Sequence, residues 1–159
     1  MSLTTLSAKI YLASFQHREA LWDPLLNEYR KRIQKLAQLD WKVFKPTASR
    51  LASSQSFIKY YEKLNKPSGP VIILDEHGSA VTTKLLSDKL LNWLDLGQAP
   101  TFLIGGAEGL ELEPLLKLPK VVCWSLSSLT LPHRLAQLTL LEQLYRALTI
   151  INHLPYHRA

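Results

Sequence analysis

Short runs of apolar residues alternate along this 159-residue chain with longer segments whose apolar residues recur every three or four positions. The short runs predict β-strands, and the periodic segments predict helices with one buried face. Regular alternation of the two is typical of an α/β domain built on a mostly parallel sheet. We therefore expect a single α/β domain over residues 1–159, with a mostly parallel sheet flanked by helices.

The expected elements follow one another without a long linker or an internal repeat. Strands are predicted at residues 9–13, 41–44, 71–74, 101–104 and 121–124. Helices are predicted at about 22–36, 56–64, 83–96 and 132–152. The fully apolar run 71–74 is expected to be a central strand. The serine-rich segment 47–55 is interpreted as a loop, and residues 66–69 as a turn.

The last predicted helix is apolar over much of its circumference. Such a helix must be covered on more than one side, which a second copy of the chain would do. We therefore expect a homodimer. Its apolar residues are Leu135, Leu138, Leu141, Leu144, Tyr145, Leu148 and Ile151.

Composition and charge narrow the class of protein. The formal net charge is +6, which favours an anionic partner and above all nucleic acid. The basic run Arg30-Lys31-Arg32 is either an RNA-phosphate contact or an ordinary solvated helix face. No apolar run is long enough for a membrane helix, and the N-terminus does not resemble a secretory signal. We expect a cytoplasmic protein that does not associate with membranes.

Three predicted strand ends carry residues suited to a ligand, and ligands of open parallel sheets bind past the carboxyl ends of the strands. The glycines matter because a residue without Cβ lets a ligand approach the backbone, although tight turns use glycine equally often. The run of glycines matches neither a phosphate loop nor a dinucleotide fingerprint. The three segments are Leu74–Gly78, Ile104–Gly109 and Ser125–Leu131.

Metal and hydrolase chemistry receive little support from the sequence. The single cysteine, Cys123, excludes an internal disulfide and a cysteine-based zinc site. Among the five histidines, only His153 and His157 are close, and Pro155 between them prevents a shared helical face. No nucleophile elbow occurs. We therefore expect no metal.

Four blocks occur in order in the last third of the chain. Together with Leu74-Asp75-Glu76-His77-Gly78, they closely resemble the ribosomal RNA large subunit methyltransferase H family. The resemblance is strong over residues 101–159 and loose over 1–70. The blocks are Ile104–Gly109, Trp124–His133, Glu142–Ala147 and Tyr156–Arg158.

The resemblance implies a SPOUT-class domain, which is a homodimeric α/β fold containing a trefoil knot with S-adenosylmethionine bound in it. The knot and the cofactor loops would lie within about 70–133, and the C-terminal helix and catalytic tail within 132–159. Carried over by position, the cofactor-binding residues are Leu74, Gly105, Gly106, Leu126, Ser127, Ser128, Leu129, Thr130 and Leu131.

The activity that the resemblance implies is methylation of N3 of a pseudouridine in large-subunit (23S) rRNA, on the assembled ribosome. N3 must lose its proton, which requires a general base or a cation beside the uracil carbonyls. For this role the resemblance suggests the tail residues Tyr156, His157 and Arg158, together with His133. Arg158 would stabilise the carbonyl charge, His157 would orient the base or accept the proton, and Tyr156 would stack on the base.

Two other functions remain open from the residues. One is a SPOUT methyltransferase with a different RNA target, and the other is a non-catalytic module that binds RNA or the ribosome. Gln137 departs from the family pattern, which has an arginine at this position, and Arg134 is a candidate replacement. Glu142, Tyr145 and Arg146 are interpreted as structural residues.

Overall fold

Strands and helices alternate along the whole chain, as the apolar pattern predicts. The computed structural model describes residues 7–64 and 68–158. The elements are β1 (Lys9–Phe15), α1 (Asp23–Gln34), β2 (Gln38–Phe44), α2 (Arg50–Lys63), β3 (Val71–Ala80), α3 (Thr83–Asp95), β4 (Thr101–Ile104), α4 (Leu112–Leu115), β5 (Val121–Ser125) and α5 (His133–Ile151).

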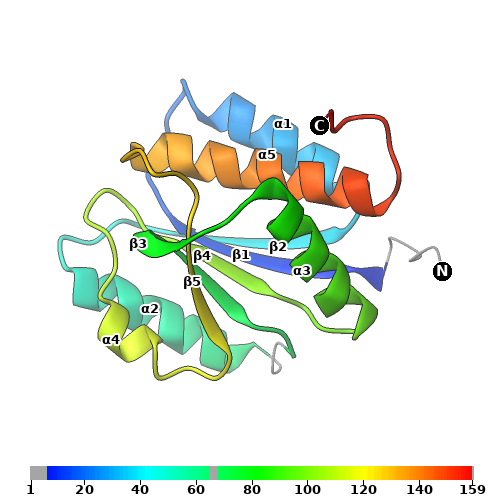
Figure 1. The fold of residues 1–159 in the computed structure, drawn as a ribbon. Coiled ribbons are helices and arrows are strands. Elements are labelled where there is room, and N and C mark those ends of the chain that lie inside the picture. The colour runs from blue at the N-terminus through cyan, green and yellow to red at the C-terminus, as the bar shows by residue number, and fades with distance from the viewer. Residues whose placement is uncertain (1–6, 65–67, 159) are drawn as a thin grey trace.

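The five strands form one sheet in the order β2-β1-β4-β3-β5 (Figure 1). Every neighbouring pair is parallel. β4 lies at the centre, where Thr101 pairs with Tyr11 of β1 and with Val71 of β3. The predicted α/β fold with a parallel sheet is therefore confirmed.

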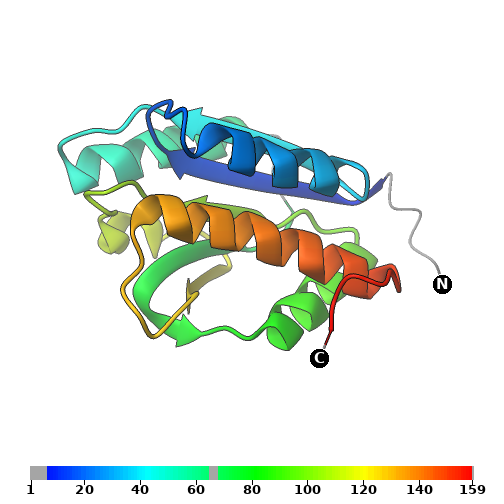
Figure 2. The ribbon, with the colours of Figure 1, turned by 90° about the horizontal axis from the view of Figure 1, so that it is seen from above.

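Helices cover both faces of the sheet. Helices α1, α3 and α5 pack on one face, and α2 and α4 pack on the other (Figure 1). Along β1, Ile10 and Leu12 point to the first face, and Ala13 and Phe15 point to the second. Helix α5 lies between α1 and α3, which both contact it (Figure 2).

β3 is longer than the sequence predicts, and the expected loop at Leu74–Gly78 is wrong. β3 pairs with β5 as far as Leu74, shifts register, and pairs again at Ser79 and Ala80. Gly78 makes this possible, because a Cβ there would lie 2.8 Å from the backbone of Cys123 and Trp124. The end of β3 thus curls around the end of β5.

The segment interpreted as a loop at 47–55 is also largely helical, because α2 begins at Arg50. Ser49 caps the helix by accepting a hydrogen bond from the Ala52 N–H at 3.1 Å. Ser54 is buried, and its hydroxyl both donates to the Glu111 carbonyl and accepts from the Glu111 N–H. Ser49 therefore caps the start of α2, and Ser54 holds the helix against the segment that contains Glu111.

Smaller departures concern element ends and short elements. β2 begins at Gln38, three residues before the predicted start. The four-residue helix α4 was too short to give a periodic pattern. Of the turn predicted at 66–69, residues 66 and 67 lie outside the described part of the chain.

Candidate functional site

The carboxyl ends of β4 and β5 and the middle of β3 surround a cavity of about 410 Å³. This is within the size range of sites that enclose small organic ligands. All the predicted cofactor-binding residues except Ser128, together with His133, line it. These are Leu74, Gly105, Gly106, Leu126, Ser127, Leu129, Thr130 and Leu131.

Further lining residues come from the same three strands and from the start of α5. Asp75 and Glu76 follow Leu74 directly and line the cavity with it. Ala136 lies one helical turn after His133, so helical spacing from His133 would have indicated it. Ser128 is exposed and does not line the cavity.

The glycine segment after β4 forms a wall of bare backbone. A Cβ on Gly106 would lie 3.1 Å from the Phe15 carbonyl oxygen, and one on Gly105 would lie 3.0 Å from Cγ of Leu110. Gly109 has a φ of +78°, a conformation that residues with a side chain rarely adopt. A side chain at any of these three positions would therefore disturb the backbone that lines the cavity.

The cavity is apolar with an acidic side. Asp75 and Glu76 contribute carboxylates, and Thr130 donates to Glu76 Oε2 at 3.3 Å. No lysine or arginine is among the described residues that line it. Burial, and next the positive charge of Arg134, lower the pKa of His133 below its ordinary value, against an opposing effect of Glu19. His133 is therefore neutral at pH 7, and the site favours a cationic ligand with an apolar body.

The loop from β5 to α5 is held by its own serines. Ser125 donates from its hydroxyl to the Ser127 carbonyl at 2.8 Å, and Ser127 Oγ accepts from the Leu129 N–H at 2.9 Å. These bonds present the backbone of Leu126 and Ser127 to the cavity. The side chain of Leu129, at the rim, is 72% exposed.

The start of α5 is fixed by a buried arginine. Arg134 is 3% exposed, donates to the His17 carbonyl and pairs with Glu19 at 3.2 Å. It also lies 3.4 Å from the Gln137 amide oxygen, and the Gln137 amide nitrogen donates to the Phe15 carbonyl at 3.4 Å. The two side chains together tie the β1–α1 loop to the wall of the cavity.

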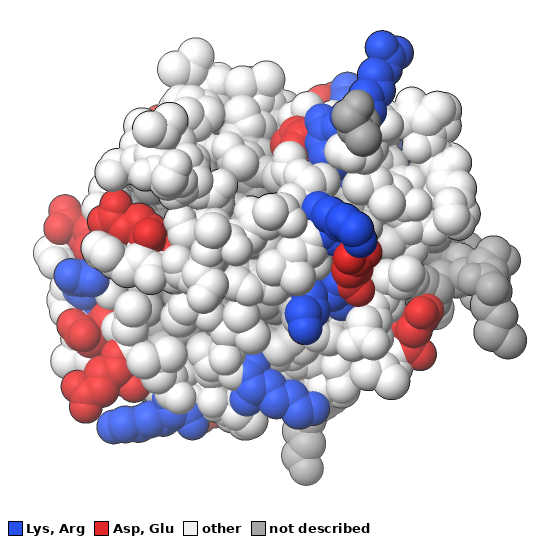
Figure 3. Space-filling model, viewed as in Figure 1, with Lys and Arg blue, Asp and Glu red and all other residues white. Residues whose placement is uncertain are grey.

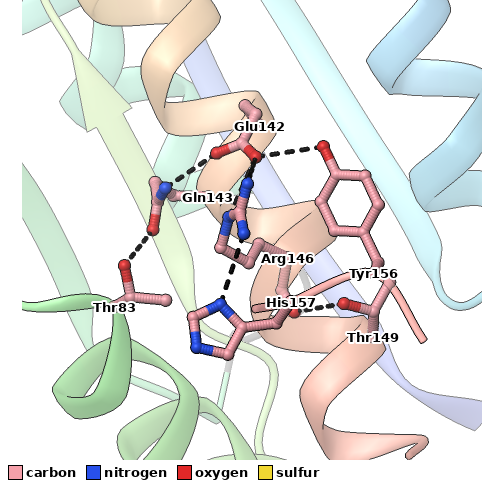
Figure 4. Close-up of polar contacts among 7 residues, drawn as sticks. All are labelled: Thr83, Glu142, Gln143, Arg146, Thr149, Tyr156 and His157. Carbon is pink, nitrogen blue, oxygen red and sulfur yellow. Dashed lines mark hydrogen bonds and ion pairs between the residues drawn. The ribbon is translucent and has the colours of Figure 1, made fainter. Parts of the chain in front are cut away.

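The C-terminal tail folds back onto α5 (Figure 4). Glu142 Oε1 accepts from Arg146 at 2.6 and 3.0 Å and from the Tyr156 hydroxyl at 3.1 Å. Arg146 also lies over the Tyr156 ring, 4.8 Å from its centroid, and its Nη1 is 3.3 Å from Nδ1 of His157. Burial, followed by hydrogen bonds with Tyr29 and Glu142, raises the pKa of Tyr156.

The tail network reaches α3 through one more residue. Gln143 donates from its amide nitrogen to Glu142 Oε2 at 2.7 Å. Its amide oxygen accepts from the Thr83 hydroxyl at 2.7 Å (Figure 4). Glu142 and Arg146 therefore have the structural role expected of them, and that role is to hold the tail.

Comparison with known proteins identifies the family. A family model described as "Predicted SPOUT methyltransferase" matches residues 8–157. The ribosomal RNA large subunit methyltransferase H of Polynucleobacter asymbioticus is 40% identical over 151 residues, which cover 94% of this chain and 99% of that protein. The protein of the same name from Methylobacillus flagellatus is 35% identical over 155 residues, which cover 94% and 99%.

This chain belongs to the ribosomal RNA large subunit methyltransferase H family. The resemblance drawn from the four blocks and the Leu74–Gly78 element is thus confirmed.

The family's expected site residues fall into two separate groups in this structure. The first group, with His133, surrounds the cavity at the start of α5. The second group contains Tyr156 and His157, which contact Glu142 and Arg146 near the other end of α5. Arg146 is thirteen residues beyond His133, which is about 20 Å along a helix. One copy of the chain therefore does not bring its own tail to its own cavity.

Within residues 7–64 and 68–158, no three His, Cys, Asp or Glu side chains are grouped closely enough to hold a metal ion. No helix in those ranges combines the length and the apolar character needed to cross a membrane.

Proposed function

We propose that this chain transfers the methyl group of S-adenosylmethionine to N3 of a pseudouridine in large-subunit rRNA, on the assembled ribosome in the cytoplasm. The names of its relatives support a large-subunit rRNA substrate. The observation that carries the proposal is the charge of the cavity, which has two carboxylates and no lysine or arginine among its described lining residues. A sulfonium cofactor suits such a site, and a phosphate-bearing cofactor does not.

The lining residues fit each part of this cofactor. Leu74, Leu126 and Leu131 offer apolar walls for the adenine ring, whose polar edge would be satisfied by backbone groups of the loop after β5. Asp75 and Glu76 supply negative charge for the ammonium group. When bound, S-adenosylmethionine supplies an electrophilic methyl group on a positively charged sulfur.

The trefoil knot is part of the proposal. Its support is the way β3 encloses β5: the two strands pair on both sides of a register shift, and the Val81 N–H donates to the Ser125 carbonyl at 3.2 Å. From there the chain continues directly through the loop 126–132 into α5. A C-terminal segment threaded past the β3–α3 connection would keep that loop against the cavity.

We propose a homodimer in which the tail of one copy completes the cavity of the other. The distance between tail and cavity within one copy is the first support. The second is the surface over α5 and the neighbouring loops, most of which is uncharged (Figure 3). Leu129, in the loop before α5, and Leu135, on α5, are exposed. Exposed leucines on an uncharged surface are typical of an interface. Light scattering that gives the mass of one chain, 18.1 kDa, at micromolar concentration would contradict it.

In the assembled site the tail would act on the uracil ring. Arginine has only donors, so the 3.3 Å contact with Arg146 makes Nδ1 of His157 the acceptor and leaves the ring proton on Nε2. His157 would then donate from Nε2 to one uracil carbonyl, and Arg158 would stabilise negative charge on the other. Polarisation of both carbonyls acidifies N3–H, whose proton passes to solvent as the methyl group transfers.

Tyr156 has a different role in this proposal from the stacking suggested by the sequence. Its ring packs edge-to-face with that of Tyr145, with 4.7 Å between the ring centroids. Arg146 lies over the Tyr156 ring, and the Tyr156 hydroxyl donates to Glu142. These contacts support an anchoring role, in which Tyr156 fixes the position of His157 and Arg158.

The test is mass spectrometry of rRNA nucleosides after incubation of the purified protein with S-adenosylmethionine and ribosomes from a strain that lacks the methyltransferase. We expect N3-methylpseudouridine from wild type, and its loss in His157→Ala and Arg158→Ala without change in the cofactor dissociation constant measured by calorimetry. A methyl group on another base would support a different RNA target. Absence of cofactor binding by the dimer would support a non-catalytic binding module.

A further inference from the structure

A second opening in the surface lies beside the sheet edge, away from the cofactor cavity. This cleft, of about 460 Å³, lies between the β1–α1 loop, α1 and the edge strand β2. We call it the Trp41 cleft. The residues used below are Gln16, His17, Arg18, Arg30, Trp41 and Val43.

A tryptophan and an arginine form the centre of the Trp41 cleft. The indole N–H of Trp41 donates to Ser14 Oγ at 2.8 Å, which fixes the orientation of the ring. The guanidinium of Arg30 lies over that ring, 5.7 Å from its centroid. Aromatic rings and arginine planes are the surfaces on which proteins stack unpaired RNA bases.

The chain segment that forms the cleft is basic. Residues 16–45 contain seven lysines and arginines and four acidic residues, so half of the chain's net charge of +6 lies in this segment. Arg18 and Arg30 line the cleft itself. Asp23, the acidic residue of its lining, already accepts a hydrogen bond from the Glu19 N–H at 3.2 Å. The cleft is therefore complementary to phosphate as well as to a base.

Gln16 adds a polar group without a partner. Its Oε1 is shielded from solvent and makes no hydrogen bond with any described residue. A buried acceptor left unpaired costs free energy, and rotation of the Gln16 side chain into the cleft would let an RNA base donate to it.

A third opening, of about 340 Å³, has lining residues in common with both the Trp41 cleft and the cofactor cavity. This opening shares Gly106, Ala107, Gly109 and His133 with the cofactor cavity, and it shares His17 with the cleft. Its carboxylates are Glu19, which is paired with Arg134, and Glu108. An RNA strand that followed this third opening would place consecutive nucleotides in the cavity and in the cleft.

We propose that the Trp41 cleft binds a nucleotide of the single-stranded rRNA next to the modified base, with the base against the Arg30–Trp41 pair and its phosphate at Arg18. The inference rests on the proposed function and adds to it the surface that positions the RNA. The described residues that line the cofactor cavity include no lysine or arginine, and the tail of the second copy would bring Arg158 to the uracil carbonyls, so a separate surface is needed to bind the neighbouring phosphate.

The first experiment compares two double variants of equal charge. Arg18→Ala/Arg30→Ala removes the cleft's cations, whereas Lys31→Ala/Lys35→Ala removes two exposed cations of the same region that do not line the cleft. We expect the first to raise the KM for ribosomes at least about tenfold, with kcat and cofactor affinity unchanged. The slope of log affinity for ribosomes against log salt concentration should become shallower by about 0.7 for each phosphate contact that this double variant loses. The second should raise KM less than about threefold. Equal effects of the two pairs would overturn the inference.

The second experiment requires no catalysis. A photo-crosslinking residue replaces Val43, which lines the cleft and is 44% exposed, or Leu96, a control at the end of α3 that is 65% exposed. We expect ribosomal RNA to cross-link at position 43 above the level at 96, at nucleotides that flank the target. If the wild-type protein fails to methylate rRNA but position 43 cross-links to it, the proposed function is contradicted and RNA binding at the Trp41 cleft is supported. A protein that methylates without this cross-link would contradict the cleft alone.

Discussion

Replacement of Glu142 by glutamine isolates the anchoring of the catalytic tail, because it removes one charge and almost no volume. Glu142 Oε1 is the common acceptor for Arg146 and for the Tyr156 hydroxyl. The side chains of Glu142 and Arg146 are only 19% and 25% exposed, so solvent weakens this pair less than it weakens a surface ion pair.

The size of the effect follows from the three hydrogen bonds at this oxygen. Bonds to a charged group contribute about 1.5–3 kcal/mol each, and neutral ones contribute about 0.5–1.5 kcal/mol. An amide oxygen in the same place would weaken each of the three by about 1 kcal/mol. Because the bonds share one acceptor and the pair is partly solvated, we expect a total loss of about 1–2 kcal/mol, or a shift of about five- to thirtyfold toward a released tail.

We predict that Glu142→Gln lowers kcat for rRNA methylation by about five- to thirtyfold and leaves the cofactor dissociation constant unchanged. Hydrogen exchange should accelerate at the amides of Leu154 and Tyr156, which donate to Thr149 and Leu154. The matched control is Glu62→Gln, an exposed position on α2. A kcat within twofold of wild type, together with faster exchange of the tail, would refute the link between tail anchoring and catalysis.

Three further predictions follow from individual contacts. Gly78→Ala should lower the free energy of unfolding by about 1–3 kcal/mol or more and weaken cofactor binding, because the added Cβ would lie 2.8 Å from backbone atoms. The control, Ser79→Ala at an exposed position, should change little. Urea unfolding measures the stability, and calorimetry measures the cofactor binding. Burial raises the pKa of Tyr60 from 10.0 to about 12. The stability that the protonated Tyr60 hydroxyl contributes is therefore complete below pH 10 and is lost as the pH rises through 12. Tyr60→Phe should reduce this alkaline loss of stability in unfolding experiments. The pKa of His133 is lowered from 6.5 in the folded protein, so the unfolded chain takes up the proton first as the pH falls. Stability is therefore lost between pH 6.5 and the folded-state pKa, and His133→Gln should flatten this part of the profile of stability against pH.

The sequence predicted the parts of the fold that depend on local periodicity. The apolar runs at 71–74 and 101–104 and the spacing of leucines in the last helix identify strands and helices because burial imposes a repeat on each. Where several polar residues served tertiary contacts, this reasoning failed. Ser53 and Ser54 lie in a buried helix face against Thr47 and Glu111, although serine-rich segments ordinarily form loops.

The site was predictable in its content but not in its arrangement. Glycines and leucines at three strand ends indicated one cavity, because parallel strands end at the same edge of the sheet. The extension of β3 to Ala80 was hidden, because Asp75–Gly78 has the composition of a turn and its pairing depends on a close approach to β5. The separation of tail and cavity along α5 depends on three-dimensional packing that no local pattern records.

A mixing experiment tests most directly whether the cavity of one copy works with the tail of another. One variant carries Gly106→Val, which must displace the glycine wall of the cavity because even a Cβ there would lie 3.1 Å from the Phe15 carbonyl oxygen. The other carries His157→Ala and Arg158→Ala. Each alone should be inactive, and the mixed dimers should regain about a quarter of wild-type rRNA methylation, because half the dimers are mixed and each has one intact site. Absence of any recovery, with mixed dimers demonstrated by mass spectrometry, would contradict the account.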